Sequence, residues 1–104
     1  MRILPEKPRE RKGEIAKCGN LKPLIKDEIM FRCADGTNKF IVAHKLLFDD
    51  GSHEVRICYW IEGDKERSRG RWMWGQYAPM LAPEDFHTLL EKMKERTDEG
   101  EVWI

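Results

Sequence analysis

The chain has few cysteines, and their spacing excludes two familiar kinds of cysteine site. Only three occur in 104 residues, Cys18, Cys33 and Cys58, and no two of them form a CxxC pair. Zinc knuckles and thioredoxin-type redox centres need such a pair, so neither has support. Unpaired thiols are typical of a reducing compartment, and we therefore expect a cytoplasmic protein.

The sequence also lacks an excess of charge of one sign. It holds 19 Lys and Arg against 19 Asp and Glu, whereas dedicated nucleic-acid-binding domains are usually basic overall. The charge is nevertheless uneven, because the first 26 residues hold eight basic and three acidic side chains. Residues 1–14 combine this charge with two prolines and a glycine, and we expect them to form a mobile basic arm.

Long apolar runs are missing too, and none approaches the roughly 20 residues that a membrane-spanning helix needs. Apolar residues make up 40% of the chain and charged residues 37%, which predicts a small core under a strongly charged surface. Four Trp and four Phe residues supply enough burial for that core to fold. We expect one domain over residues 15–104 and no contact with a membrane.

Apolar side chains alternate with other residues in four segments, which predicts four β-strands. The turn sequences Asp35-Gly36 and Asp50-Gly51 separate the first three segments, so an antiparallel meander is the natural topology. The predicted strands cover residues 28–34, 39–48, 54–62 and 69–77.

A helical period follows the last predicted strand. Pro83 suits the first position of a helix, and Gly100 supplies a stop signal. The spacing i, i+3, i+4, i+7 gives an apolar stripe of Phe86, Leu89, Leu90 and Met93. The sequence therefore predicts an α+β fold, in which a four-stranded antiparallel β-meander precedes one C-terminal amphipathic helix.

A single helix can cover only part of a four-stranded sheet. The remainder must be covered by residues 15–25, by the apolar tail at residues 102–104, or by a second copy of the chain. On this ground we expect a homodimer.

Side chains that could perform catalysis gather only at residues 49–54, "DDGSHE". Two aspartates, His53 and Glu54 could bind a metal ion or exchange protons there, but the same residues are typical of a polar hairpin turn, which we prefer. His44 alternates with apolar neighbours and is expected to be structural. Phosphate-binding loops, nucleophile elbows and spaced metal ligands are missing, so we expect no enzymatic activity, no cofactor and no metal site.

Two of the four Trp residues stand two positions apart in "RWMW". Trp72 and Trp74 therefore share one face of the predicted strand. If that face meets the helix, the indoles belong to the core; if it faces away, they form an exposed stacking platform. Trp60 and Arg56 join the same face only in one register of the hairpin, and the loop at residues 63–68 is too long to fix that register.

An exposed platform of this kind suits single-stranded DNA or RNA, because every base offers a face for stacking. Our leading hypothesis is a non-enzymatic domain that binds single-stranded nucleic acid across its sheet. Asp64 and Glu66 alternate with the basic side chains of the loop and reduce its positive charge. The alternative is a protein-interaction or homo-oligomerisation module, since Trp and Arg also dominate protein interfaces. The candidate binding residues are Arg56, Trp60, Arg67, Arg69, Arg71, Trp72 and Trp74.

Four features of the second half of the chain carry a family resemblance. They are Tyr59-Trp60 at a strand end, Gly70-Arg71 after a polar loop, Leu81-Ala82-Pro83-Glu84 at the helix start, and the apolar stripe of the helix. In this order they resemble the single-strand DNA-binding domain of the positive cofactor four family of transcriptional coactivators. The resemblance implies a four-stranded antiparallel sheet followed by a helix, a dimer, and nucleic-acid binding through Arg and aromatic side chains of the sheet.

Overall fold

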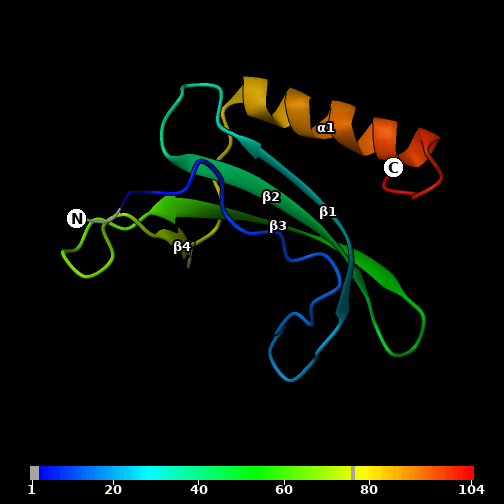
Figure 1. The fold of residues 1–104 in the computed structure, drawn as a ribbon. Coiled ribbons are helices and arrows are strands. Elements are labelled where there is room, and N and C mark those ends of the chain that lie inside the picture. The colour runs from blue at the N-terminus through cyan, green and yellow to red at the C-terminus, as the bar shows by residue number, and fades with distance from the viewer. Residues whose placement is uncertain (1–2, 76) are drawn as a thin grey trace.

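The predicted meander and helix are both present in the computed structural model, which describes residues 3–75 and 77–104 (Figure 1). Four antiparallel strands form one sheet in the order β1-β2-β3-β4, and one helix follows them. This confirms the α+β fold class. The elements are β1 (Leu24–Arg32), β2 (Lys39–Leu47), β3 (His53–Glu62), β4 (Trp72–Trp74) and α1 (Pro83–Asp98).

Strand β1 begins four residues earlier than the alternation predicts, because a bulge interrupts its period. Ile25 pairs with Leu46 and Asp27 with Lys45, so Lys26 is an extra residue in the ladder. The bulge shifts the alternation by one residue, so side chains before it do not continue the pattern of those after it. The start of the strand at Leu24 therefore cannot be recognised from a period-two pattern.

Strand β4 is shorter than the predicted segment at residues 69–77, of which residue 76 lies outside the described residues. Residues 65–71 form turns instead, in which the Ser68 and Arg69 amides donate to the Lys65 carbonyl and the Arg71 amide donates to Ser68. Each of these bonds closes a local turn, so the chain reaches an extended conformation only at Trp72.

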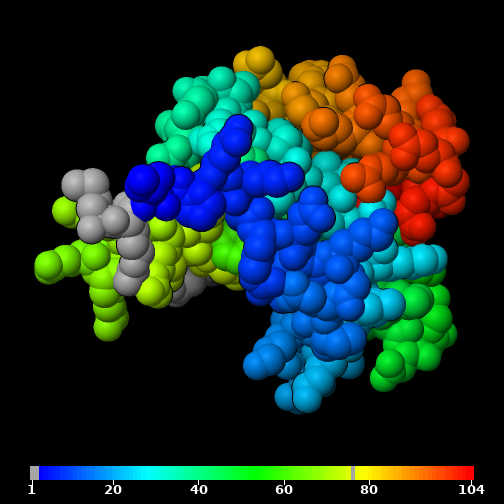
Figure 2. Space-filling view, in the orientation of Figure 1, coloured from blue at the N-terminus to red at the C-terminus, as the bar shows by residue number. Residues whose placement is uncertain are grey.

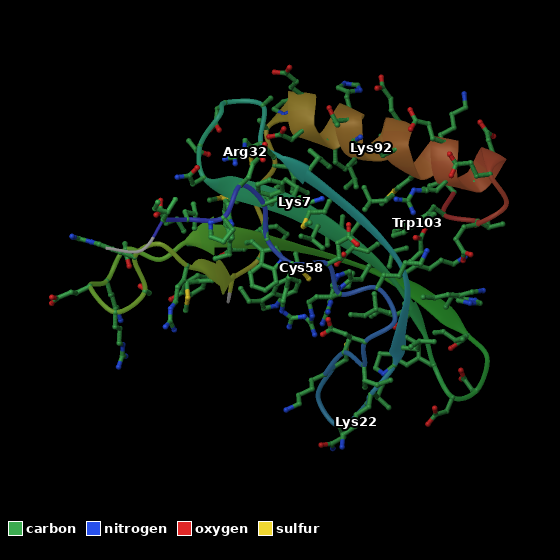
Figure 3. All side chains as sticks on the ribbon, viewed as in Figure 1. Lys7, Lys22, Arg32, Cys58, Lys92 and Trp103 are labelled. Carbon is green, nitrogen blue, oxygen red and sulfur yellow. The ribbon has the colours of Figure 1, made fainter. Side chains whose placement is uncertain are left out.

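Helix α1 covers one face of the sheet, which we call the helix face (Figure 1). Leu89 and Met93 of the helix pack against Ile29 and Ala43 of the sheet. Trp103 completes this cluster, since the tail turns back beneath the helix (Figure 3). The apolar tail therefore packs on its own domain, as one of the sequence alternatives proposed.

Residues 3–23, the N-terminal segment, lie across the opposite face of the sheet (Figures 1 and 2). Ala16 packs against Ile25 and Leu46 in a second apolar cluster, and the Gly13 amide donates to the Ile25 carbonyl. The part at residues 3–14, expected to be a mobile arm, takes part in this layer, where Pro8 is buried. Both faces of the sheet are thus covered by the chain itself, at least in part.

Asp27 joins β1 to the helix and to the tail. Its carboxylate accepts hydrogen bonds from Arg96 Nη1 at 2.6 Å and from the Trp103 indole at 2.9 Å, and Lys12 Nζ lies 3.5 Å away. Burial alone would raise the pKa of Asp27, but the hydrogen bonds from Trp103 and the Glu28 amide, with the charge of Arg96, bring that pKa below its ordinary value.

Acid is therefore expected to weaken the docking of the helix and the tail. A carboxylate with a lower pKa in the folded state adds stability that is complete above its unfolded pKa, about 3.9, and is lost as the pH falls through the folded value. Asp27→Asn should be less stable than the wild type at pH 7, and the difference should shrink on acidification. Urea unfolding at several pH values measures this; a difference that stays constant down to about pH 2 would contradict the assignment.

No helix among residues 3–75 and 77–104 is long and apolar enough to span a membrane.

Candidate nucleic-acid interface

The pairing of β3 with β4 decides where the tryptophans face. Trp60 lies opposite Trp74 and Glu62 opposite Trp72, so the three indoles share one face. Trp60 packs there with Phe40 and with both β4 indoles, in a cluster separate from the residues under α1. The indoles therefore face away from the helix, and the register is the one in which Trp60 and Arg56 join them.

We call Phe40, Trp60, Trp72 and Trp74 the tryptophan cluster. Trp60 and Trp74 meet edge to face with ring centroids 4.8 Å apart, and Phe40 meets Trp72 in the same way at 5.2 Å. Such edge contacts are the favoured geometry of aromatic pairs. Trp60 is only 8% exposed, whereas Trp72 and Trp74 are half-buried. The cluster is therefore neither a fully open platform nor an entirely buried core.

Residues of the N-terminal segment and of β1 cover part of the tryptophan cluster. The Trp72 indole donates to the Pro5 carbonyl at 2.9 Å, and the Arg11 guanidinium lies 5.0 Å from the ring centroid of Trp74. Arg32 stands 4.9 Å from the centroid of Phe40 and 5.9 Å from that of Trp72. These distances place both guanidinium groups within cation–π range of the rings.

Sequence reasoning missed both of these arginines. Arg32 carried a signal, because it lies two residues after Met30, which also packs against the cluster. Arg11 carried none, since its segment has no period, and only the fold brings it onto Trp74.

A buried polar network lies beside the cluster. His44 is fully buried, with Nε2 at 2.5 Å from Glu28 Oε2 and Nδ1 at 3.0 Å from Arg56 Nη2. A guanidinium can only donate, so Nδ1 accepts and the ring proton sits on Nε2, where Glu28 accepts it. The other Glu28 oxygen accepts the Arg11 amide at 3.0 Å, which ties the N-terminal segment to the sheet. The ring of His44 also stacks on Trp74, with centroids 5.7 Å apart.

Arg56, a predicted phosphate ligand, is engaged inside this network. It donates to His44, approaches Cys18 Sγ at 3.8 Å, and lies 5.6 Å from the centroid of Trp74. Its Nε is buried without a hydrogen-bond partner among the described residues. Arg56 therefore supports the cluster from within, and Trp60 does the same because almost none of its ring reaches the surface.

The other predicted arginines lie on the loop between β3 and β4, at the end of the sheet nearest the start of the N-terminal segment (Figure 1). Ser68 is the buried residue of this loop, and it holds the turn by donating to the Lys65 carbonyl through Oγ. The side chains of Arg67, Arg69 and Arg71 are exposed around it. Trp72 follows directly, so a half-buried indole adjoins a basic loop.

Residues 49–54 form a turn and the start of β3. The Asp50 carboxylate accepts hydrogen bonds from the amide and the hydroxyl of Ser52 at 2.9 Å and 2.6 Å, and these two bonds lower the pKa of Asp50. Throughout the described parts of the chain, no group of three or more His, Cys, Asp or Glu residues could hold a metal ion. The two bonds from Ser52 to Asp50 make residues 50–52 a hydrogen-bonded turn.

The cysteines near the sheet are poor nucleophiles. Burial raises the pKa of Cys58, and burial together with the charge of Asp85 raises that of Cys33. A raised pKa leaves less of the reactive thiolate at neutral pH.

No protein-family model, curated protein or solved structure matches this chain.

Proposed function

We propose that the protein is a non-enzymatic module that binds single-stranded nucleic acid along the strip from Trp74 through Trp72 to the loop at residues 63–71. One observation carries this proposal: two half-buried indoles on one sheet face lie directly beside an exposed loop with three arginines. Aromatic rings beside basic side chains are the two parts of a surface that binds single strands without sequence preference.

The roles divide between the two parts. Trp72 and Trp74 offer ring surface to bases, and each stacked base contributes about 1–3 kcal/mol. Arg69 and Arg71 are exposed on the loop that leads into Trp72, and in this proposal they bind phosphates of the same strand. Trp60 and Arg56, which the sequence also predicted as contacts, act here as the rigid support beneath the indoles.

The N-terminal segment limits how much of the cluster a strand can use. Pro5 already accepts the Trp72 indole proton, and Arg11 occupies one face of the Trp74 ring. Two half-buried indoles accommodate few bases, so the proposal is for a short site with modest affinity and strong salt dependence.

The test is a titration of a fluorescently labelled mixed-sequence oligonucleotide at several salt concentrations. Arg69→Gln/Arg71→Gln should weaken binding of all sequences alike, and it should lower the slope of log K against log[salt] by about 1.4, or roughly 0.7 for each lost phosphate contact. Trp72→Leu should weaken binding with little change in that slope, because stacking releases no counterion.

Lys92→Gln/Lys94→Gln is the matched control, since it removes two positive charges from α1 on the other side of the sheet (Figure 3 labels Lys92). It should leave both affinity and slope unchanged. A flat wild-type titration at low salt would overturn the proposal and leave a protein-interaction module as the better hypothesis.

A further inference from the structure

Half of strand β3 has an open outer edge. Strand β4 pairs only with Trp60, Ile61 and Glu62, and one further bond runs from the Gly75 amide to the Tyr59 carbonyl. Among the described residues this is the last backbone bond on that side of β3, and the Tyr59 ring lies so close to Gly75 that a Cβ there would be 2.1 Å from it. Among the described residues, none hydrogen-bonds to the outer side of β3 at residues 53–57.

The pairing near β4 shows which backbone groups point outward along this edge. The Tyr59 carbonyl accepts from Gly75 and the Gly63 amide donates to Arg71, so the odd-numbered residues direct their backbone groups away from β2. By the same alternation, His53, Val55 and Ile57 present unpaired amides and carbonyls. The free ladder is therefore three residues long on that side, with Val55 at its centre.

An exposed edge of this kind is a template for another strand. We propose that a second copy of the chain fills it, through antiparallel pairing of β3 with β3 about a two-fold axis at Val55. His53 of one copy then pairs with Ile57 of the other, and Val55 pairs with itself. The proposed nucleic-acid strip lies at the opposite end of β3, and the two sites share Arg56, whose guanidinium lies 5.6 Å from the centroid of Trp74.

Three requirements select this register. A shift of one residue would set odd residues against even ones and leave the outward backbone groups unmatched. Centring the axis on Arg56 would set His53 against Tyr59, whose carbonyl Gly75 already occupies, and would place two arginines face to face. Centring it on Glu54 would oppose two carboxylates and shorten the ladder. Only the axis at Val55 uses the whole free stretch without opposing like charges.

The side chains of this register are complementary on both faces. Glu54 lies opposite Arg56 of the second copy, whose guanidinium also donates to His44 of its own chain, and the two-fold axis repeats this pair. Opposite charges directly across a strand pair stabilise it, whereas like charges destabilise it. On the helix face the two Val55 side chains meet, and Val55 is 45% exposed in the single chain. A second copy therefore provides backbone partners for the open edge, a charge of opposite sign for Glu54 and an apolar contact for Val55.

Sedimentation equilibrium over a range of concentrations measures the self-association. The wild type should shift from 12.3 kDa toward twice that mass as the concentration rises. Glu54→Lys places two positive charges opposite each other at both symmetric positions, and should weaken association about tenfold or more. Glu91→Lys makes the same charge change on the exposed surface of α1 and should leave association as in the wild type. A wild type that stays monomeric, or a dimer that Glu54→Lys does not weaken, would overturn the proposal.

Disulfide trapping tests the register itself. Paired Val55 residues would have Cα atoms about 5.5 Å apart, within the range of a disulfide, whereas the His53 Cα atom would be about 14 Å from its symmetry mate. Oxidised glutathione should therefore cross-link Val55→Cys into a covalent dimer, the new disulfide forming as glutathione is reduced. The wild type gives the background from the native cysteines, and His53→Cys should not exceed it. Equal cross-linking of the two variants, or none of Val55→Cys, would exclude this register.

Discussion

Replacing His44 by alanine is expected to lower the free energy of unfolding by about 3–5 kcal/mol, because it leaves a cavity where a buried ring was and takes a hydrogen-bond donor from a buried carboxylate. The ring is fully buried and bridges Glu28 and Arg56. Without it, the carboxylate of Glu28, a residue that is only 7% exposed, loses its imidazole donor, and Arg56 loses its acceptor. Since small domains are stable by only about 5–15 kcal/mol, this one substitution should bring the protein close to unfolding.

Urea unfolding followed by far-ultraviolet circular dichroism measures the effect. His53→Ala is the matched control, because His53 is exposed at the start of β3 and should change stability by no more than about 0.5 kcal/mol. The double variant Glu28→Gln/His44→Ala should recover part of the loss, since it removes the uncompensated charge as well. If His44→Ala were as stable as His53→Ala, the network could not be what ties the N-terminal segment to the sheet.

Replacing Trp103 by alanine is expected to cost a similar amount, about 3–5 kcal/mol, the range for truncating a buried Trp. The indole is 7% exposed, packs against Leu89 and Met93, and donates to Asp27. Its removal opens a cavity beneath α1 and leaves one oxygen of a buried carboxylate without its donor. Thermal unfolding by calorimetry measures the loss.

Two further variants separate the causes. Trp103→Phe keeps most of the ring volume but cannot donate to Asp27. Its free energy of unfolding should therefore lie between those of the wild type and Trp103→Ala. Val102→Ala is the control, because Val102 is 62% exposed next to the buried indole. Equal losses for Trp103→Ala and Val102→Ala would mean that the tail does not contribute to the core.

The strands and the helix could be predicted because each imposes its own period on the sequence. Residues 54–62 alternate cleanly, and β3 is observed at His53–Glu62; Pro83 was expected to open the helix, and it does. The bulge at Lys26 and the local turns of residues 65–71 break their periods, which is why β1 and β4 were misplaced at their ends. Element identity therefore followed from local pattern, and element length did not.

The candidate site was only partly predictable, because it depends on contacts between distant segments. The hydrogen bond from Trp72 to Pro5 joins residues 67 positions apart, and the local sequence around either residue does not indicate it. The register that unites Trp60 with Trp74 depends on a loop whose turns the sequence left open. Glu28 was not recognised as buried, because its partner His44 lies on another strand and its cover, Arg11, lies on a segment without a period.

The contact between Asp27 and Trp103 also bears on how the protein is made. The two residues are 76 positions apart, and the bond between them closes the core beneath α1. During synthesis the β1–β2–β3 hairpins can pair as they emerge, because their contacts are local in sequence. The carboxylate of Asp27, however, stays without its indole partner until residue 103 has left the ribosome. In a nascent chain stalled before that point, the sheet should form but α1 should not pack stably on it. Such a chain should be cut by proteases far more readily than the released protein.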